Sequence, residues 1–314
     1  MHALARQCTI SAEAAFKGVG IHSGRSCCVT VKPAPVDRGI VFRHVQHQGC
    51  IPCEVTSVFS TNLCTVLAPN VPTRIHDSGL SGWLLRRWFT PPWRVSTVEH
   101  LLAAIAGLGV ENVTVEVDGP EVPILDGSSE VFVNTLADLL TFQPAQRPQP
   151  RIEVVREVRV ESDGGSRWAM LSPSGENDSV DDFRISVSIE FAGEVELQKF
   201  SFLRSEFVSS GTYRARTFGF AKDLPMLRRS GLASGATLNN AVLVDRGTVA
   251  NKSGLRFKEE LAMHKGLDCL GDMRLGGQFV RTNYTAHKPG HGLNFRLLRR
   301  LFQERSNFRT LCPN

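Results

Sequence analysis

The chain has 314 residues, enough for two domains of ordinary size, and its 42% hydrophobic and 21% charged residues are typical of a globular protein. Its formal net charge of +5 suits an anionic small substrate and is too weak to indicate nucleic acid, so we expect no nucleic-acid partner. No run of about eighteen apolar residues occurs, which excludes a membrane-spanning helix.

Strands and helices are interleaved in the first half of the chain. Alternating apolar residues predict strands at 26–32 and 113–117, and the apolar spacing within 95–109 and 131–140 predicts helices. The strands are short, and no Gly-rich phosphate loop opens a βαβ unit. An α+β domain therefore fits this half better than a doubly wound parallel sheet.

A Trp-rich insert at residues 67–94 interrupts this pattern. Its segment 80–93 holds three of the four tryptophans, is basic, and ends in two prolines. Trp and Arg both suit the headgroup zone of a bilayer, so a peripheral membrane contact through 80–93 is one interpretation. A buried turn, an oligomer contact or a faulty gene model are the others. Nothing in the sequence demands more than a monomer.

Three prolines without apolar periodicity mark residues 142–150 as a connection between domains. We place an N-terminal α+β domain at 1–143, a linker at 144–150 and a C-terminal α+β domain at 151–314. Eight scattered cysteines lack the spacing of a disulfide framework. We therefore expect reduced thiols and a cytoplasmic location, or an organelle if the host is eukaryotic.

The second half again mixes both kinds of element. Residues 152–160 suggest a hairpin or paired strands, and the alternation at 183–189 predicts a half-buried strand. Helices are expected at 221–229, 258–270 and 293–302.

Two acidic residues follow a histidine at helical spacing near the end of the chain. His264 and Asp268 are four residues apart, so they share one face of the predicted helix, and Asp272 lies one further turn along. Such a pair can chelate a divalent ion. The alternative is a surface histidine with an ordinary i,i+4 carboxylate partner.

Two further histidines could join such a site. His100 follows Glu99 at a predicted helix start, where they could supply a metal ligand and a general base. Alternatively, Glu99 completes a capping box with Ser96 and His100 faces solvent. His291, between two glycines, is either free to reach into a cleft or an ordinary loop residue.

A different metal or redox site could lie at His44, His47, Cys50 and Cys53. The two ligand pairs are too close in sequence for the usual structural zinc site, whose pairs are separated by a loop. No nucleophile elbow, Walker A loop or H-E-x-x-H motif occurs.

Several weak motifs become specific through their order along the chain, which is 18–24, 97–102, 120–128, 216–220, 240–242, 255–257, 264–272 and 290–294. This order resembles the UDP-3-O-acyl-N-acetylglucosamine deacetylase family of lipid A biosynthesis, from about residue 7 to about residue 302. The resemblance implies two domains of similar β-α-α-β layered sandwich topology with the active site between them. It also implies one catalytic zinc ion held by His100, His264 and Asp268.

The resemblance assigns further roles, residue by residue. It makes Glu99 the general base and His291 the acid, and the Thr217 hydroxyl would donate a hydrogen bond to the oxyanion. Lys265 and Asp272 would flank the site. It implies that Leu63, Cys64 and Phe218 line the metal pocket. It places Phe191 near the uracil and Lys288 near the diphosphate. The acyl chain would pass along Leu238, Ala241 and Leu243.

The implied reaction is zinc-dependent hydrolysis of the N-acetyl group of UDP-3-O-acyl-N-acetylglucosamine, with acetate and UDP-3-O-acyl-glucosamine as products. Three rivals stay open: a hydrolase of the same fold with another amide substrate, a non-catalytic binder of UDP-sugars or lipid, and a redox or structural-zinc protein built on Cys50 and Cys53. The insert and the Ala-Gly-Glu sequence after Phe191, where the family usually has His-Pro, leave room for the first rival. The second is weakened because every catalytic position is present.

Overall fold

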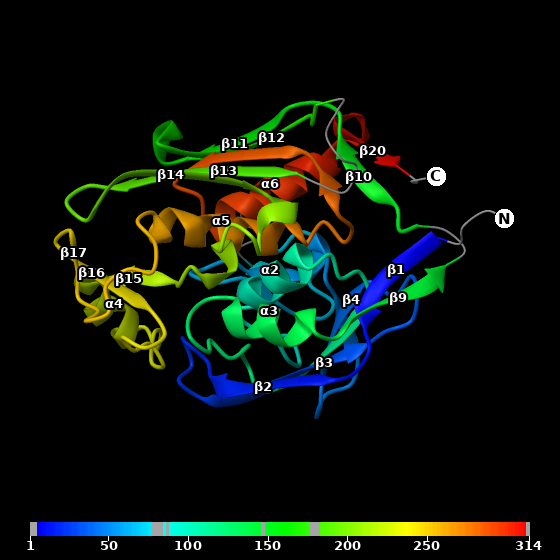
Figure 1. The fold of residues 1–314 in the computed structure, drawn as a ribbon, viewed down its shortest axis with the longest axis horizontal. Coiled ribbons are helices and arrows are strands. Elements are labelled where there is room, and N and C mark those ends of the chain that lie inside the picture. Colours follow the sequence, from blue (N-terminus) through cyan, green and yellow to red (C-terminus); the bar gives the residue numbers. More distant parts are fainter. Residues whose placement is uncertain (1–4, 77–83, 86–87, 146–147, 176–182, 312–314) are drawn as a thin grey trace.

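The computed structural model describes residues 5–76, 84–85, 88–145, 148–175 and 183–311. Seen from the side, it is built in layers: one sheet lies at each face and helices lie between the two sheets (Figure 1). Mixed helices and strands of this kind confirm the expected α+β class.

The N-terminal sheet holds five strands with one parallel pair. Its order is β2 (Ala14–Val19), β3 (Ser26–Pro33), β8 (Val113–Asp118), β4 (Ile40–His44) and β5 (Cys50–Pro52). Only the β4–β8 pair is parallel. Burial alternates along β3, so one face of the sheet packs on the core and the other faces outward.

The C-terminal sheet repeats that pattern with different strands. Its order is β11 (Val158–Ser162), β12 (Arg167–Ser172), β19 (Asn283–His287), β13 (Arg184–Phe191) and β14 (Val195–Leu203). Again the fifth strand in sequence, β19, lies in the middle and forms the one parallel pair, with β13.

Helices follow the strands in the same places in both halves. In each half a long central helix lies between the fourth and fifth strands, α2 (Glu99–Gly107) and α5 (Glu260–Met273), and another follows the fifth strand, α3 (Glu130–Ala137) and α6 (His291–Gln303). Helices α2 and α5 pack directly against each other at the centre of the molecule (Figure 1).

Smaller elements complete the described chain. Its short sheets pair β1 (Ala5–Ile10) with β9 (Leu140–Ala145); β10 (Arg151–Val154) with β18 (Val280–Arg281) and β20 (Phe308–Leu311); β16 (Val242–Asp245) with β15 (Phe218–Phe220) and β17 (Thr248–Val249); and β6 (Val58–Ser60) with β7 (Val66–Leu67). Its short helices are α4 (Leu224–Arg229) and the 3-10 turns Val55–Ser57, Asp163–Gly165, Arg204–Glu206, Thr212–Arg214, Ala221–Asp223 and Arg305–Asn307.

Most predicted elements are present, and the differences have identifiable causes. The helix expected at 131–140 ends at Ala137, because Leu140 already pairs with Ile10 at the start of β9. The same strand takes in Pro144 and Ala145, the first two residues of the expected linker. The two strands expected at 152–160 are present, but their expected pairing with each other is wrong, since β10 pairs with β18 and β20 while β11 pairs with β12.

The Trp-rich insert is described only in part, with 77–83 and 86–87 outside the described residues. Within it, Trp88 is 74% exposed and Leu84 is 40% exposed, whereas Trp93 is buried. Among the helices that the structure describes, none is both long enough and apolar enough to cross a bilayer.

Candidate active site

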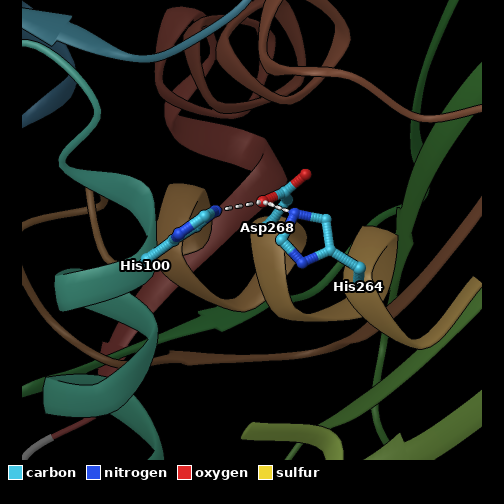
Figure 2. A group of neighbouring side chains, drawn as sticks. All are labelled: His100, His264 and Asp268. Carbon is cyan, nitrogen blue, oxygen red and sulfur yellow. Dashed lines mark ion pairs between the residues drawn. The ribbon is translucent and has the colours of Figure 1, made fainter. Parts of the chain in front are cut away.

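Three predicted ligands from two helices meet in the interior. His100 lies on α2 and His264 and Asp268 on α5, and all three side chains are buried. Asp268 Oδ1 lies 3.6 Å from His100 Nε2 and 3.3 Å from His264 Nε2 (Figure 2). Among the described residues this is the one group of three metal-ligating side chains, with its ligand atoms within 4.8 Å of one another.

The surrounding contacts leave the facing atoms of this group available. His264 Nδ1 lies 3.0 Å from Ala215 O and donates its proton there, which leaves Nε2 as a lone-pair donor. Lys265 Nζ donates to Asp268 Oδ2 at 2.8 Å, whereas Asp268 Oδ1 is buried without a hydrogen-bond partner. An unpartnered buried oxygen between two imidazole nitrogens fits a divalent cation.

Protonation states in the group also fit a metal. Burial, the largest cause, lowers the pKa of His264 to about 4, so the imidazole is neutral at physiological pH. Burial would raise the pKa of Asp268, but His264 and Lys265 outweigh it and the pKa is well below its usual value. Neutral histidines and an ionised aspartate are the forms that bind metal.

Glu99 is fully buried beside this group and is not a helix cap. Helix α2 begins without a side-chain cap at Val98, so the predicted capping box with Ser96 is wrong. Glu99 Oε2 instead accepts the Thr65 backbone N–H at 3.0 Å, and its Oε1 lies 3.6 Å from His291 Nε2. Burial raises the pKa of Glu99 despite the nearby histidines, which makes the carboxylate a better base.

His291 is held by a chain of buried hydrogen bonds and starts α6, so it is not an ordinary loop residue. Its Nδ1 lies 2.8 Å from Asp272 Oδ2. Thr65 Oγ1 donates to Asp272 Oδ1 at 2.7 Å, and Asn294 Nδ2 donates to Asp272 Oδ2 at 2.8 Å. Burial would lower the pKa of His291, but Asp272 and Glu99 raise it to about 10, so the imidazole is protonated at neutral pH.

A cavity of about 900 Å³ opens onto these groups. It is lined by most of the predicted site residues, namely Leu63, Glu99, His100, Phe191, Thr217, Phe218, Leu238, Ala241, Leu243, His264, Lys265, Asp268 and His291. Three others are not among its lining residues: Asp272 and Cys64 are buried, and the Lys288 carbonyl accepts a hydrogen bond from Arg167 Nε at 3.1 Å. Arg167 itself lines the cavity.

One wall of the cavity is aromatic. The Phe191 ring lies 6.3 Å from Phe218 and 5.0 Å from Phe220, measured between centroids, and Lys265 Nζ lies 5.5 Å from the Phe218 centroid. This wall joins the metal-ligating group to the small sheet of β15, β16 and β17.

Sequence reasoning missed several residues that hold the site together. Glu121 accepts the backbone N–H groups of His22 and Ser23 and the Thr97 hydroxyl, so it joins the motifs at 18–24, 97–102 and 120–128. Thr65 and Asn294 support Glu99 and Asp272. The motif at 120–128 contains Glu121 and could have singled it out, but no local pattern singles out Thr65.

The structure does not support the alternative interpretations of the histidines and of the Cys50 and Cys53 motif. His264 is 1% exposed and His100 is 4% exposed, so neither is a solvent-facing histidine. At the Cys50 and Cys53 motif, Cys50 is exposed, Cys53 is buried, and burial raises the pKa of Cys53 to about 12. A thiol of that kind is neither a ready metal ligand nor a redox nucleophile.

Comparison with known proteins agrees with this site. A family model described as UDP-3-O-acyl N-acetylglycosamine deacetylase matches residues 7–303. UDP-3-O-acyl-N-acetylglucosamine deacetylases from Mannheimia succiniciproducens and Haemophilus influenzae are 38% and 37% identical, covering 94% of this chain and 90% and 89% of theirs. The protein of that name from Shewanella violacea is 36% identical over 91% of this chain and 86% of its own. The chain therefore belongs to the UDP-3-O-acyl-N-acetylglucosamine deacetylase family.

Proposed function

We propose that this chain hydrolyses the N-acetyl group of UDP-3-O-acyl-N-acetylglucosamine, giving acetate and UDP-3-O-acyl-glucosamine, as an early step of lipid A biosynthesis. The observation that carries the proposal is one cavity lined by a His-His-Asp group, a buried glutamate and a buried histidine. The names of the relatives, which cover nearly the whole chain, supply the substrate.

The cofactor of the proposal is one zinc ion held by His100, His264 and Asp268. Two imidazoles and one carboxylate form a donor set that zinc accepts, and three protein ligands are the pattern of catalytic rather than structural zinc. When bound, zinc supplies Lewis acidity that lowers the pKa of water to about 7. Asp268 Oδ1 would be the donor atom of the carboxylate, because Oδ2 already accepts a hydrogen bond from Lys265.

Glu99 and His291 divide the proton transfers in this proposal. Glu99 takes a proton from water as the water oxygen attacks the acetamide carbonyl, and the Thr65 N–H keeps the carboxylate in place. His291 carries its proton on Nε2, because Nδ1 donates to Asp272. That proton goes to the departing amine nitrogen when the C–N bond breaks.

The negative charge that develops on the carbonyl oxygen meets two groups of the chain. Protonated His291 and the Thr217 hydroxyl both line the cavity, and one such contact is typically worth about 3–4 kcal/mol. Lys265 holds Asp268, and Asp272 holds His291, so these two act on the ligand and the acid.

The substrate's other groups are assigned along the cavity. We assign the uracil to Phe191 and the diphosphate to Lys288, with Leu63, Cys64 and Phe218 around the sugar. The acyl chain lies along Leu238, Ala241 and Leu243 beside β16. Cys64 and Lys288 are not among the lining residues, so we assign their contacts to a rearrangement of the cavity wall or to their backbone atoms.

The two-domain arrangement is also part of the proposal, with domains 1–143 and 151–314 joined through 144–150. Its support is the shared strand order of the two five-stranded sheets and the matching positions of α2 and α5. We further propose a cytoplasmic monomer that touches membranes through 80–93, where Leu84 and Trp88 are exposed.

A Glu99→Gln variant tests the chemistry. The amide keeps the shape of the side chain but takes no proton, so we expect kcat to fall by about 10²- to 10⁴-fold with zinc content unchanged. Deacetylation is assayed with UDP-3-O-acyl-N-acetylglucosamine and with the unacylated sugar nucleotide. Full activity in this variant, or equal turnover of both substrates by the wild type, contradicts the proposal.

A further inference from the structure

A second cavity lies on the outward face of the N-terminal sheet. Its volume is about 690 Å³, and it shares no described lining residue with the active-site cavity. Phe16 points to α3, where its ring lies 4.8 Å from that of Phe132, so the neighbouring Lys17 faces the other way. The floor of the cavity is the outward row Lys17, Cys28 and Asp118, which are cross-strand partners on β2, β3 and β8.

Two segments wall this floor off from solvent. One is the end of β4 with the residues after it, which carry His44 and His47, and the other is residues 90–94 at the end of the Trp-rich insert. The Trp93 indole Nε1 donates to Gln48 O at 3.3 Å and joins the two walls. A solvent-facing sheet surface is ordinarily flat, so these walls turn it into a concave, nucleotide-sized space.

The lining of this cavity is strongly cationic. Lys17, Arg25 and Arg94 line it, and within the described part of the chain none of the three forms an ion pair. Asp118 is the one carboxylate among the described lining residues. Three cations facing one carboxylate in a concave space attract anions, and phosphate groups suit such an array of donors.

The two histidines add hydrogen-bond donors to the same space. The Gln46 N–H donates to His44 Nδ1 at 3.1 Å, so the neutral ring carries its proton on Nε2. The His44 and His47 rings lie 4.6 Å apart, and the described residues hold no group here that could bind a metal ion. The histidine motif of the sequence therefore belongs to this cationic cavity rather than to a zinc site.

We propose that this second cavity, lined by Lys17, Arg25, Arg94, His44 and His47, is a binding site for the phosphate groups of an anionic ligand. The site is independent of the deacetylase reaction, because it lies on the far face of the sheet from the metal-ligating group. Its ligand is either a free phosphorylated compound or a phospholipid headgroup, which share the chemistry that the cavity recognises.

Titration with inorganic pyrophosphate tests the site, read through the imidazole NMR signals of His44 and His47 in the full chain. We expect saturable shifts of both signals in the wild type. A Lys17→Gln, Arg94→Gln double variant should weaken binding by about tenfold or more, because two charged hydrogen bonds are lost. The matched control is Arg38→Gln, an exposed cation of the same domain outside the cavity, which should bind as the wild type does.

Sedimentation with vesicles separates the two sources of phosphate. Binding to phosphatidylglycerol vesicles but not to phosphatidylcholine vesicles, lost in the double variant, assigns the site to headgroups; pyrophosphate binding without vesicle binding assigns it to a free ligand. The proposal would be overturned if pyrophosphate left the His44 and His47 signals unchanged and the double variant bound vesicles as the wild type does. Deacetylation by the double variant should equal that of the wild type.

Discussion

The two carboxylate oxygens of Asp268 have different partners, and this difference organises the site. Oδ2 accepts the Lys265 ammonium, while Oδ1 is left between the two histidines. The same division occurs at His264, whose Nδ1 is bound to Ala215 O. Asp268 and His264 are thus each fixed by one polar atom and present the other, as in well-ordered metal sites.

Local spacing predicts part of this site and no more. His264 and Asp268 are four residues apart on one helix, so their common face follows from helix geometry alone. His100 is on another helix, and its place depends on how α2 packs on α5. Only the ordered motifs of the family join it to the other two, and no residue pattern reveals that Ala215 O fixes the His264 tautomer.

Asn294 is expected to position the acid of the reaction through Asp272. Asn294→Ala removes the amide that donates to Asp272 Oδ2, so the Asp272 carboxylate and His291 lose their fixed orientation. We expect kcat to fall by about tenfold or more, with KM and zinc content nearly unchanged.

The matched control for this variant is Tyr284→Phe. It removes only the hydroxyl that donates to Asn294 Oδ1 at 2.6 Å, so its loss in kcat should be smaller. Wild-type kcat in Asn294→Ala would show that Asp272 is held well enough without the amide.

At the scale of elements, α5 meets α2 at a glycine. A Cβ on Gly271 would lie 2.1 Å from the carbonyl oxygen of Glu99, a distance that no real side chain tolerates. The absence of a side chain at Gly271 therefore lets the two ligand-bearing helices approach closely. A glycine inside a helix otherwise destabilises it relative to alanine, which indicates a packing reason for this one.

Gly271→Ala is expected to force α2 and α5 apart. Overpacking of this kind costs about 1–3 kcal/mol of unfolding free energy, and the shift of His100 should weaken zinc binding. Gly266→Ala is the control on the same helix, because the nearest atoms to its Cβ belong to the Phe202 ring, at 2.9 Å, and not to α2. Equal zinc affinities in the two variants, measured by competition with a chelator, would contradict this account.

A buried ion pair joins the start of α5 to the Thr217 segment. Arg216 Nε and Nη2 donate to Glu260 at 2.8 and 3.0 Å, and Glu260 also accepts the backbone N–H of Arg216 and of Arg256. Burial would raise the pKa of Glu260, but these donors lower it below its usual 4.5. The pair should therefore stabilise the fold at every pH above that value.

The sign of the pH dependence follows from this lowered pKa. The stabilisation by Glu260 is complete above pH 4.5 and is lost as the pH falls through the lower pKa of the folded state. Glu260→Gln should lose about 3–5 kcal/mol at pH 7, because Arg216 is left buried without its partner. In urea unfolding, the difference in unfolding free energy between the wild type and Glu260→Gln should narrow below pH 4.5. A difference that stays constant with pH would contradict this prediction.

Element boundaries illustrate what sequence patterns could not predict. Alternation predicts strands at 113–117 and 183–189 well, because each has one buried and one open face. The strand at 140–145 contains Pro144 and leaves Phe142 exposed, so it has no buried face, and it exists because β1 pairs with it along its whole length. Likewise, the Glu99 carboxylate does not cap its helix but accepts the backbone N–H of Thr65, which is far away in sequence.

At the scale of the whole molecule, the two halves carry the same strand order and place equivalent helices at the centre. The first half supplies His100 and Glu99, and the second supplies His264, Asp268 and His291. Neither half has a complete site, so activity depends on how the halves pack (Figure 1). Composition and periodicity predict two α+β halves, but the meeting of α2 with α5 becomes visible only in three dimensions.

Metal analysis of the purified chain tests the central claim most directly. We predict one zinc per wild-type chain, lost in His264→Ala, which removes a ligand, and kept in Cys50→Ala, which alters an exposed thiol remote from the group. Zinc that survives His264→Ala but disappears in Cys50→Ala would contradict the account.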